Sequence, residues 1–303
     1  MGRQGNRVTT EERHEPTILV EEAASLFHLL GGMSAKHLII IGGLVPPLLL
    51  PDAPETHVGS ADIDLCLSVA ITRGATRDYY ESIQEKIEPY FEPAHGSGGF
   101  RWRKKQGAPG VPLLIDFLAP ESDDDRTLVD GTRELSEGAA SANAGPQLRP
   151  FALRTGDLID RDTETRTIDA LSLVYRPGAK ADVIVRFAGP VGFLAAKADA
   201  LNGRDDAKDG YDVSWWCLHA AGSPGEVAGL VIERPAFRDP LFAEAVWELK
   251  GAFRDPSYVG PDGYARETLP HLGEGDDEYD EARNRAYARV SAVIAELESR
   301  LFG

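Results

Sequence analysis

The sequence predicts an α/β (α+β) fold in which a mixed sheet is followed by a C-terminal helical region. Up to residue 189, short apolar runs rich in β-branched residues alternate with amphipathic segments of helical period. After Gly189-Pro190, nearly every segment has helical periodicity. The 303 residues, 42% of them hydrophobic, are enough to bury a sizeable core. We expect a flexible N-terminus over residues 1–15, a core over 16–189 and a helical domain over 190–303.

The core is expected to begin with a helix over residues 16–30, whose apolar positions recur every three or four residues. An apolar run at 37–41 is typical of a buried strand, which Gly42 and Gly43 end. The further elements expected before residue 189 are a short helix or turn at 44–50, a strand at 62–70, a helix at 76–91, strands at 100–105 and 112–119, an irregular loop at 121–150, and strands at 151–154, 165–174 and 181–187. The last helix of the chain is expected at 277–301.

The acidic composition limits which partners the protein can bind. The formal net charge is −17, so the chain repels polyanions at long range and needs a local basic patch to bind nucleic acid. Residues 101–105, "RWRKK", are the best such patch, and a solvated edge strand is the alternative. Two cysteines exclude a disulfide framework, and no run approaches the roughly 18 apolar residues of a membrane span. We therefore expect a cytoplasmic protein without a membrane partner.

Two aspartates stand one residue apart in the stretch "GSADIDL" at residues 59–65. Alternate side chains of a strand share a face, so Asp62 and Asp64 point the same way while Ile63 points to the core. Their Cα atoms would lie roughly 6 to 7 Å apart. Both carboxylates could then reach one divalent cation, or a pair of cations.

Neighbouring residues strengthen the interpretation as a metal–triphosphate site. Gly59 permits a close backbone approach and Ser60 offers a hydroxyl, both of which suit a phosphate tail. Asp116, alone in the apolar run "PLLIDFLA", is the candidate third carboxylate. Mg²⁺ prefers a few carboxylates together with waters and substrate phosphates. The alternative is an ordinary half-exposed strand, which can show the same alternation of aspartate and apolar residues.

A second charged block, "KADALNGRDDAKDGYD", covers residues 197–212. Its side chains at spacings of three or four residues are Lys197, Leu201, Arg204, Lys208 and Asp212. An unbroken helix would project them on one side, where two lysines and an arginine could neutralise a triphosphate. Gly203 can break that helix, and a solvated charged face with i,i+4 pairs is the alternative.

The chain resembles the polymerase-beta-like nucleotidyltransferase superfamily, and within it most closely the AbiEii/MenT toxin-like group. The matching motifs, in order, are Gly42-Gly43, "GSADIDL" at 59–65, "LLID" at 113–116 and the block from Lys197 to Asp212. The superfamily shares the aspartate motif, and the late block points to the group. The resemblance implies a polymerase-beta-like core and transfer of NMP from an NTP with Mg²⁺ or Mn²⁺. It further implies tRNA as a frequent acceptor, and a toxin–antitoxin system with a cognate antitoxin.

The resemblance also implies roles for individual residues. The implied metal ligands are Asp62, Asp64 and Asp116. The implied nucleotide-binding residues are Gly42, Gly43, Gly59, Ser60, Lys197 and Lys208. The implied catalytic residues are Asp62, Asp64, Asp116, Lys197 and Asp212. Among these, Asp116 is also the candidate base for the acceptor hydroxyl.

One position departs from the group, and three functions stay open. Many members carry an arginine four residues before the first aspartate, where this chain has Val58. His57, or an arginine from elsewhere, is the candidate substitute. The open functions are an RNA-directed nucleotidyltransferase toxin, an enzyme that nucleotidylates a small molecule such as an antibiotic, and a non-catalytic binding protein on the same scaffold. The acidity favours the second, and the intact motif residues argue against the third.

Overall fold

The computed structural model describes residues 13–32, 36–68, 75–121, 128–129, 132–133, 148–170, 172–203 and 207–303. The N-terminal stretch expected to be flexible lies outside the described residues except for 13–15. Most of the loop expected at 121–150 lies outside them too.

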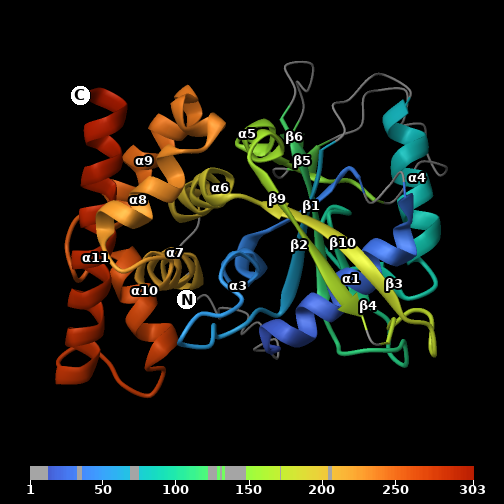
Figure 1. Ribbon diagram of the computed structural model, residues 1–303. Coiled ribbons are helices and arrows are strands. Elements are labelled where there is room, and N and C mark those ends of the chain that lie inside the picture. The colour runs from blue at the N-terminus through green and yellow to red at the C-terminus, as the bar shows by residue number, and fades with distance from the viewer. Residues whose placement is uncertain are drawn as a thin grey trace, which may run out of the picture.

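A mixed β-sheet forms the centre of the molecule (Figure 1). Its strand order is β6-β7-β8-β5-β2-β1-β10-β9, and β4 pairs with both β3 and β5. The pairs β1–β10, β2–β5 and β5–β8 are parallel. The strand bounds are β1 Leu38–Ile41, β2 Asp62–Leu67, β3 Phe91–Pro93, β4 Arg101–Lys104, β5 Leu114–Pro120, β6 Leu128–Val129, β7 Thr132–Arg133, β8 Phe151–Leu153, β9 Thr163–Ala170 and β10 Ala181–Ala188.

Helices lie on both sides of the sheet, with α1 and α4 on one side and the helices from α6 onward on the other (Figure 1). The bounds of the α-helices are α1 Pro16–Leu30, α3 Val45–Leu49, α4 Ala75–Ile87, α5 Gly156–Arg161, α6 Pro190–Gly203, α7 Ala207–His219, α8 Pro224–Ile232, α9 Pro240–Ala252, α10 Val259–Thr268 and α11 Asp277–Phe302. The described residues also form the short 3-10 helices η1 Gly42–Leu44 and η2 Pro235–Arg238.

Alternation along the central strands sends side chains into two different layers. Leu38 and Ile40 of β1 pack with α1 and α4, whereas Ile39 and Ile41 pack with α6 and the helices after it. In β2, Ile63 belongs to the layer of α1 and α4. The aspartates that flank it therefore lie on the opposite face, which is the face of α6.

One apolar cluster continues from the sheet into the C-terminal helices. It contains Ile39 of β1, Cys66 of β2, Phe193 of α6 and Val290 of α11, all fully or almost fully buried. The two sides of the division expected at residue 189 thus share a core, and the division into domains itself stays a prediction.

The elements that differ from those expected include a helix, a strand and a loop. The helix expected at 76–91 ends at Ile87, because Pro89 has no N–H to continue it and Phe91 begins β3. The strand expected at 165–174 is β9, which covers 163–170 because it pairs with the whole length of β10. The loop expected to be irregular at 121–150 contains β6 and β7, which pair with each other.

The fold class expected from the sequence, an α/β arrangement with a mixed sheet and a C-terminal helical region, is confirmed. None of the helices formed by the described residues combines the length and apolarity that crossing a lipid bilayer requires. The longest, α11, has 26 residues and carries three acidic side chains in its first turn.

Candidate active site

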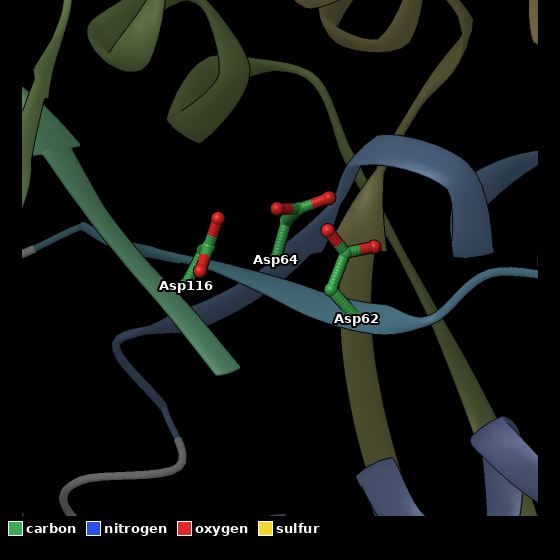
Figure 2. Close-up of side chains that lie close together, drawn as sticks. All are labelled: Asp62, Asp64 and Asp116. Atoms are coloured by element: carbon green, nitrogen blue, oxygen red, sulfur yellow. The ribbon is translucent and has the colours of Figure 1, made fainter. Parts of the chain in front are cut away.

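Three carboxylates gather where β2 and β5 lie side by side. Asp62, Asp64 and Asp116 each offer an oxygen, and these oxygens lie within 4.8 Å of one another. Asp64 and Asp116 are direct partners in the parallel pair of strands, and Asp62 shares the face of Asp64 because it stands two residues earlier. Figure 2 shows all three side chains on the same side of the two strands. The structure therefore unites the three acidic residues that the sequence singled out.

The donor set suits a hard divalent cation. Mg²⁺ and Mn²⁺ prefer carboxylate oxygens, and three carboxylates converge here. The side chain of Asp62 is 28% exposed, whereas that of Asp116 is 9% exposed. Ser60 Oγ donates a hydrogen bond to Asp62 Oδ1 at 2.6 Å, which fixes the orientation of that carboxylate. Ser60 thus orients Asp62, while the phosphate contact expected of its hydroxyl stays a prediction.

The two glycines after β1 allow the backbone to approach both charged groups of the site. Gly42 has a φ of +69°, and a Cβ on it would overlap the carboxylate of Asp64. A Cβ on Gly43 would overlap the ammonium group of Lys208. Gly42 therefore has a conformational and a steric reason to lack a side chain, whereas at Gly43 the flexible end of Lys208 would have to move.

The loop that precedes β2 is held from two sides. Gly59 has a φ of +81°, and a Cβ on it would overlap the carbonyl oxygen of His14. The backbone N–H of His14 donates to the carbonyl of Ser60 at 2.9 Å. The backbone N–H of Val58 donates to the hydroxyl of Tyr211 on α7 at 3.0 Å. The loop is therefore bound both to the chain before α1 and to the helical region.

Arg101 of β4 belongs to the carboxylate cluster. Its Nε donates to Asp116 Oδ1 at 2.7 Å and its Nη2 donates to Asp116 Oδ2 at 2.6 Å. The antiparallel register of β4 and β5 makes the two residues direct partners. The hydrogen bonds to Asp116 raise the pKa of Arg101, so the guanidinium stays charged. Its Nη2 also lies 4.0 Å from Asp62 Oδ2.

A second, buried cluster of charges joins α6 to α7. Lys197 Nζ lies 2.8 Å from Asp209 Oδ1 and 2.5 Å from Asp212 Oδ2. Lys208 Nζ lies 3.2 Å from Asp212 Oδ2. The side chains of Lys197 and Asp212 are 4% and 0% exposed, so each needs the other's charge.

Two helices, and not one, carry the described residues of this block. Helix α6 ends at Gly203 and α7 begins at Ala207, while Arg204 lies outside the described residues. Lys197 and Asp212 still meet, because α6 and α7 pack against each other. Their contact comes from helix pairing and not from a shared helix face.

His57 connects the loop before β2 to this buried cluster. Its Nδ1 accepts a hydrogen bond from the backbone N–H of Gly59 at 3.1 Å, so the ring proton belongs on Nε2. Nε2 in turn donates to Asp212 Oδ1 at 2.9 Å. The His57 side chain is 0% exposed, so the structure does not support His57 as a substitute for the arginine that Val58 replaces.

Burial and neighbouring charges set the protonation states of the cluster. Burial lowers the pKa of His57, even though its bond to Asp212 acts in the opposite direction. Burial alone would raise the pKa of Asp212, but Lys197, Lys208 and His57 hold it well below the usual range. Burial lowers the pKa of Lys197, but Asp209 and Asp212 outweigh this effect and raise it. The imidazole is therefore neutral, while the lysine and the aspartate are charged.

A cavity of about 510 Å³ opens beside the carboxylates. Asp64 and Asp116 border it on the sheet side and Lys197 borders it on the side of α6. Its apolar part includes the rings of Phe100 and Phe151, whose centroids are 5.6 Å apart. Ligand pockets commonly have roughly 300 to 1,000 Å³, so the cavity is large enough for a nucleotide.

Arg154 lines the cavity and forms ion pairs with side chains of two helices, α6 and α9. Its Nη2 lies 2.5 Å from Asp199 Oδ1 on α6 and 2.9 Å from Glu248 Oε1 on α9, and its Nη1 lies 2.9 Å from Glu244 Oε2 on α9. Neither Arg101 nor Arg154 was assigned to the site from the sequence. Their positions depend on pairing between distant segments, which no local motif records.

The basic run at 101–105 does not form a continuous exposed basic face. Trp102 is fully buried, and Lys104 is buried in an ion pair with Glu22 at 2.7 Å. Arg103 is exposed but pairs with a glutamate of β3 at 2.5 Å. The strand alternation therefore divides the run between two faces, and the nucleic-acid patch expected there finds no support.

Comparisons with known proteins give only distant likenesses. Neither a protein-family model nor a curated protein matches the chain. The structure is similar to that of an antigenic nucleotidyltransferase-like protein from Paracoccidioides brasiliensis, with a TM-score of 0.42, 15% identity, and coverage of 76% of this chain and 88% of that one. It is also similar to an inferred nucleotidyltransferase from H. pylori, with a TM-score of 0.35, 11% identity, and coverage of 94% and 97%. Likenesses this distant do not decide a function, which has to be inferred from the site itself.

Proposed function

We propose that the protein is a metal-dependent nucleotidyltransferase that transfers NMP from an NTP to an acceptor hydroxyl. The observation that carries this proposal is the convergence of Asp62, Asp64 and Asp116 within 4.8 Å beside a nucleotide-sized cavity. The glycine turn after β1 and the Gly59-Ser60 loop support it, because both place backbone and hydroxyl groups next to the carboxylates.

The transfer forms one bond and breaks another. The acceptor oxygen bonds to the α-phosphorus, and the bond from that phosphorus to the bridging oxygen breaks. Pyrophosphate leaves with the bonding electrons, and the acceptor proton passes to a carboxylate or to water. A divalent ion, when bound, supplies charge stabilisation for the triphosphate. Asp62 and Asp64 would hold this ion, and Ser60 would keep Asp62 oriented.

The buried cluster on α6 and α7 supports the loop that carries these groups. His57 connects Asp212 to Gly59 through two hydrogen bonds. This connection of the loop before β2 therefore depends on the charged state of Asp212. Lys208 Nζ lies at the Gly43 backbone and bonds to Asp212. The phosphate contacts expected of Lys197 and Lys208 stay part of the proposal. For Lys197, its two aspartate partners favour a positioning role.

The acceptor has two candidates. The resemblance to the AbiEii/MenT toxin-like group suggests tRNA, in a cytoplasmic toxin–antitoxin setting with a cognate antitoxin. A small-molecule acceptor is favoured by a specific observation, because the run at 101–105 lacks an exposed basic face and the net charge is −17. A small acceptor could enter the cavity without meeting this repulsion.

The test incubates the protein with Mg²⁺ and each α-labelled NTP, and offers total tRNA, a protein mixture and aminoglycosides as separate acceptors. Asp62→Asn and Asp64→Asn remove one charge each with little change of shape. Asp182→Asn, an exposed aspartate on β10, is the matched control. We expect label transfer by the wild type and the control, and a loss of at least about 100-fold in the two site variants. Absence of transfer to every acceptor, or transfer that survives Asp64→Asn, would refute the proposal.

A further inference from the structure

The carboxylate cluster already contains one cation, and it belongs to the protein. Arg101 holds both oxygens of Asp116 in a two-pronged hydrogen bond, at 2.7 and 2.6 Å. Arrangements of this kind are the strongest that arginine makes with a carboxylate. The Asp116 side chain is 9% exposed and that of Arg101 is 34% exposed, so the carboxylate end of the pair is shielded from water.

The register of the strands makes Arg101 and Asp116 neighbours. Arg101 and Asp116 are direct partners across β4 and β5, and Asp116 and Asp64 are direct partners across β5 and β2. Guanidinium and carboxylates therefore follow one another across three adjacent strands. The guanidinium lies on the Asp116 side of the cluster, with Nη2 still 4.0 Å from Asp62 Oδ2.

The charges of the cluster limit how many divalent ions it can bind. Three carboxylates carry three negative charges, and Arg101 offsets one of them. A second ion bound by the protein would have to displace the guanidinium from Asp116, or lie beside it at the cost of like-charge repulsion.

We propose, on the basis of the function proposed above, that Arg101 takes the place of a second metal ion. The protein holds one divalent cation between Asp62 and Asp64. Asp116 accepts the two hydrogen bonds of Arg101 and does not ligate that cation. This site therefore differs from the three-ligand arrangement that the sequence suggested.

The experiment counts Mn²⁺ ions bound by the nucleotide-free chain, using equilibrium dialysis and electron paramagnetic resonance of the free ion. The wild type should bind one ion per chain. Arg101→Gln removes the charge and should admit a second ion, with at least a tenfold gain in its affinity. Arg101→Lys keeps the charge and should bind one ion. Arg103→Gln is the matched control, because Arg103 lies two residues further on β4 and its side chain is 64% exposed.

Aspartate variants give a second reading that does not depend on how well the Arg101 variants fold. Asp62→Asn and Asp64→Asn should abolish Mn²⁺ binding, whereas Asp116→Asn should retain one ion. Loss of the ion in Asp116→Asn would overturn the assignment, and so would two ions in the wild type, although the proposed transferase function would stand in both cases. No bound ion in any form of the nucleotide-free chain would overturn the assignment, whereas the label-transfer assay decides the proposed function.

Discussion

His57 Nε2 donates a hydrogen bond to Asp212 Oδ1 across 2.9 Å, and both side chains are completely buried. The bond joins the loop before β2 to helix α7. Since His57 also accepts from the Gly59 N–H, a neutral imidazole satisfies both of its neighbours. Protonation of the ring would break the bond from Gly59, because both nitrogens would then be donors.

This arrangement predicts a loss of stability in mild acid. Burial places the pKa of His57 in the folded state below its ordinary value of 6.5. The unfolded chain therefore takes up a proton at a higher pH than the folded chain. The stabilisation is complete above pH 6.5 and is lost as the pH falls through the folded-state pKa. Urea unfolding at pH 7.5 and 5.5 should show a smaller pH dependence in His57→Asn than in the wild type. His271→Asn, at an exposed histidine, should leave the dependence unchanged.

Gly42→Ala should damage the metal site more than the fold. The positive φ costs about 1–2 kcal/mol for any residue with a Cβ, and the new methyl group would overlap the Asp64 carboxylate. Gly96→Ala is the matched control, since Gly96 has a φ of +78° and open space around it. Both variants should lose similar stability in urea titrations. Only Gly42→Ala should lose Mn²⁺ binding, and equal metal binding by the two variants would contradict the steric role of Gly42.

Lys197→Met should strongly destabilise the protein. The substitution leaves Asp209 and Asp212 buried without their main counter-ion, and breaking a buried pair costs about 3–5 kcal/mol. Lys250→Met removes a lysine that is 52% exposed and pairs with Glu298 on the surface, which should cost about 0–1 kcal/mol. Chemical denaturation of both variants measures the difference. Similar losses would show that the buried cluster does not carry the stability assigned to it.

Mg²⁺ should stabilise the folded chain against heat. A ligand that binds only the folded state adds about 2.7 kcal/mol when present at 100 times its dissociation constant. The melting temperature of the wild type and of Asp182→Asn should therefore rise with Mg²⁺, and that of Asp62→Asn should not. A rise of equal size in Asp62→Asn would place the responsible ion elsewhere on the protein.

The sequence is informative where a local pattern determines the geometry. Period-two alternation alone places Asp62 and Asp64 on one face, and a single aspartate inside an apolar strand marks Asp116. The helix at 16–30 and the last helix are likewise predicted almost to the residue, because their apolar stripes are continuous.

Pairing between distant segments is what the sequence does not reveal. The contact of Arg101 with Asp116 depends on the register of β4 against β5, and that of Lys197 with Asp212 depends on how α6 packs on α7. Likewise, no motif indicates that His57 turns inward to a residue 155 positions later. Such contacts follow from tertiary packing, so the sequence does not show that Lys197 and Lys208, which are expected to contact phosphates, also pair with buried aspartates.

The bond between His57 and Asp212 also has a consequence for protein synthesis. A ribosome releases the loop before β2 long before it completes α7, so the first two hundred residues emerge before Asp212 can bind His57. Of the two lysines that neutralise Asp212, Lys197 precedes it on α6 and Lys208 lies on the same helix, α7. A nascent or prematurely terminated chain thus contains the aspartates of β2 but lacks the hydrogen bond between His57 and Asp212 that stabilises the preceding loop. The site is completed only when α7 has been made.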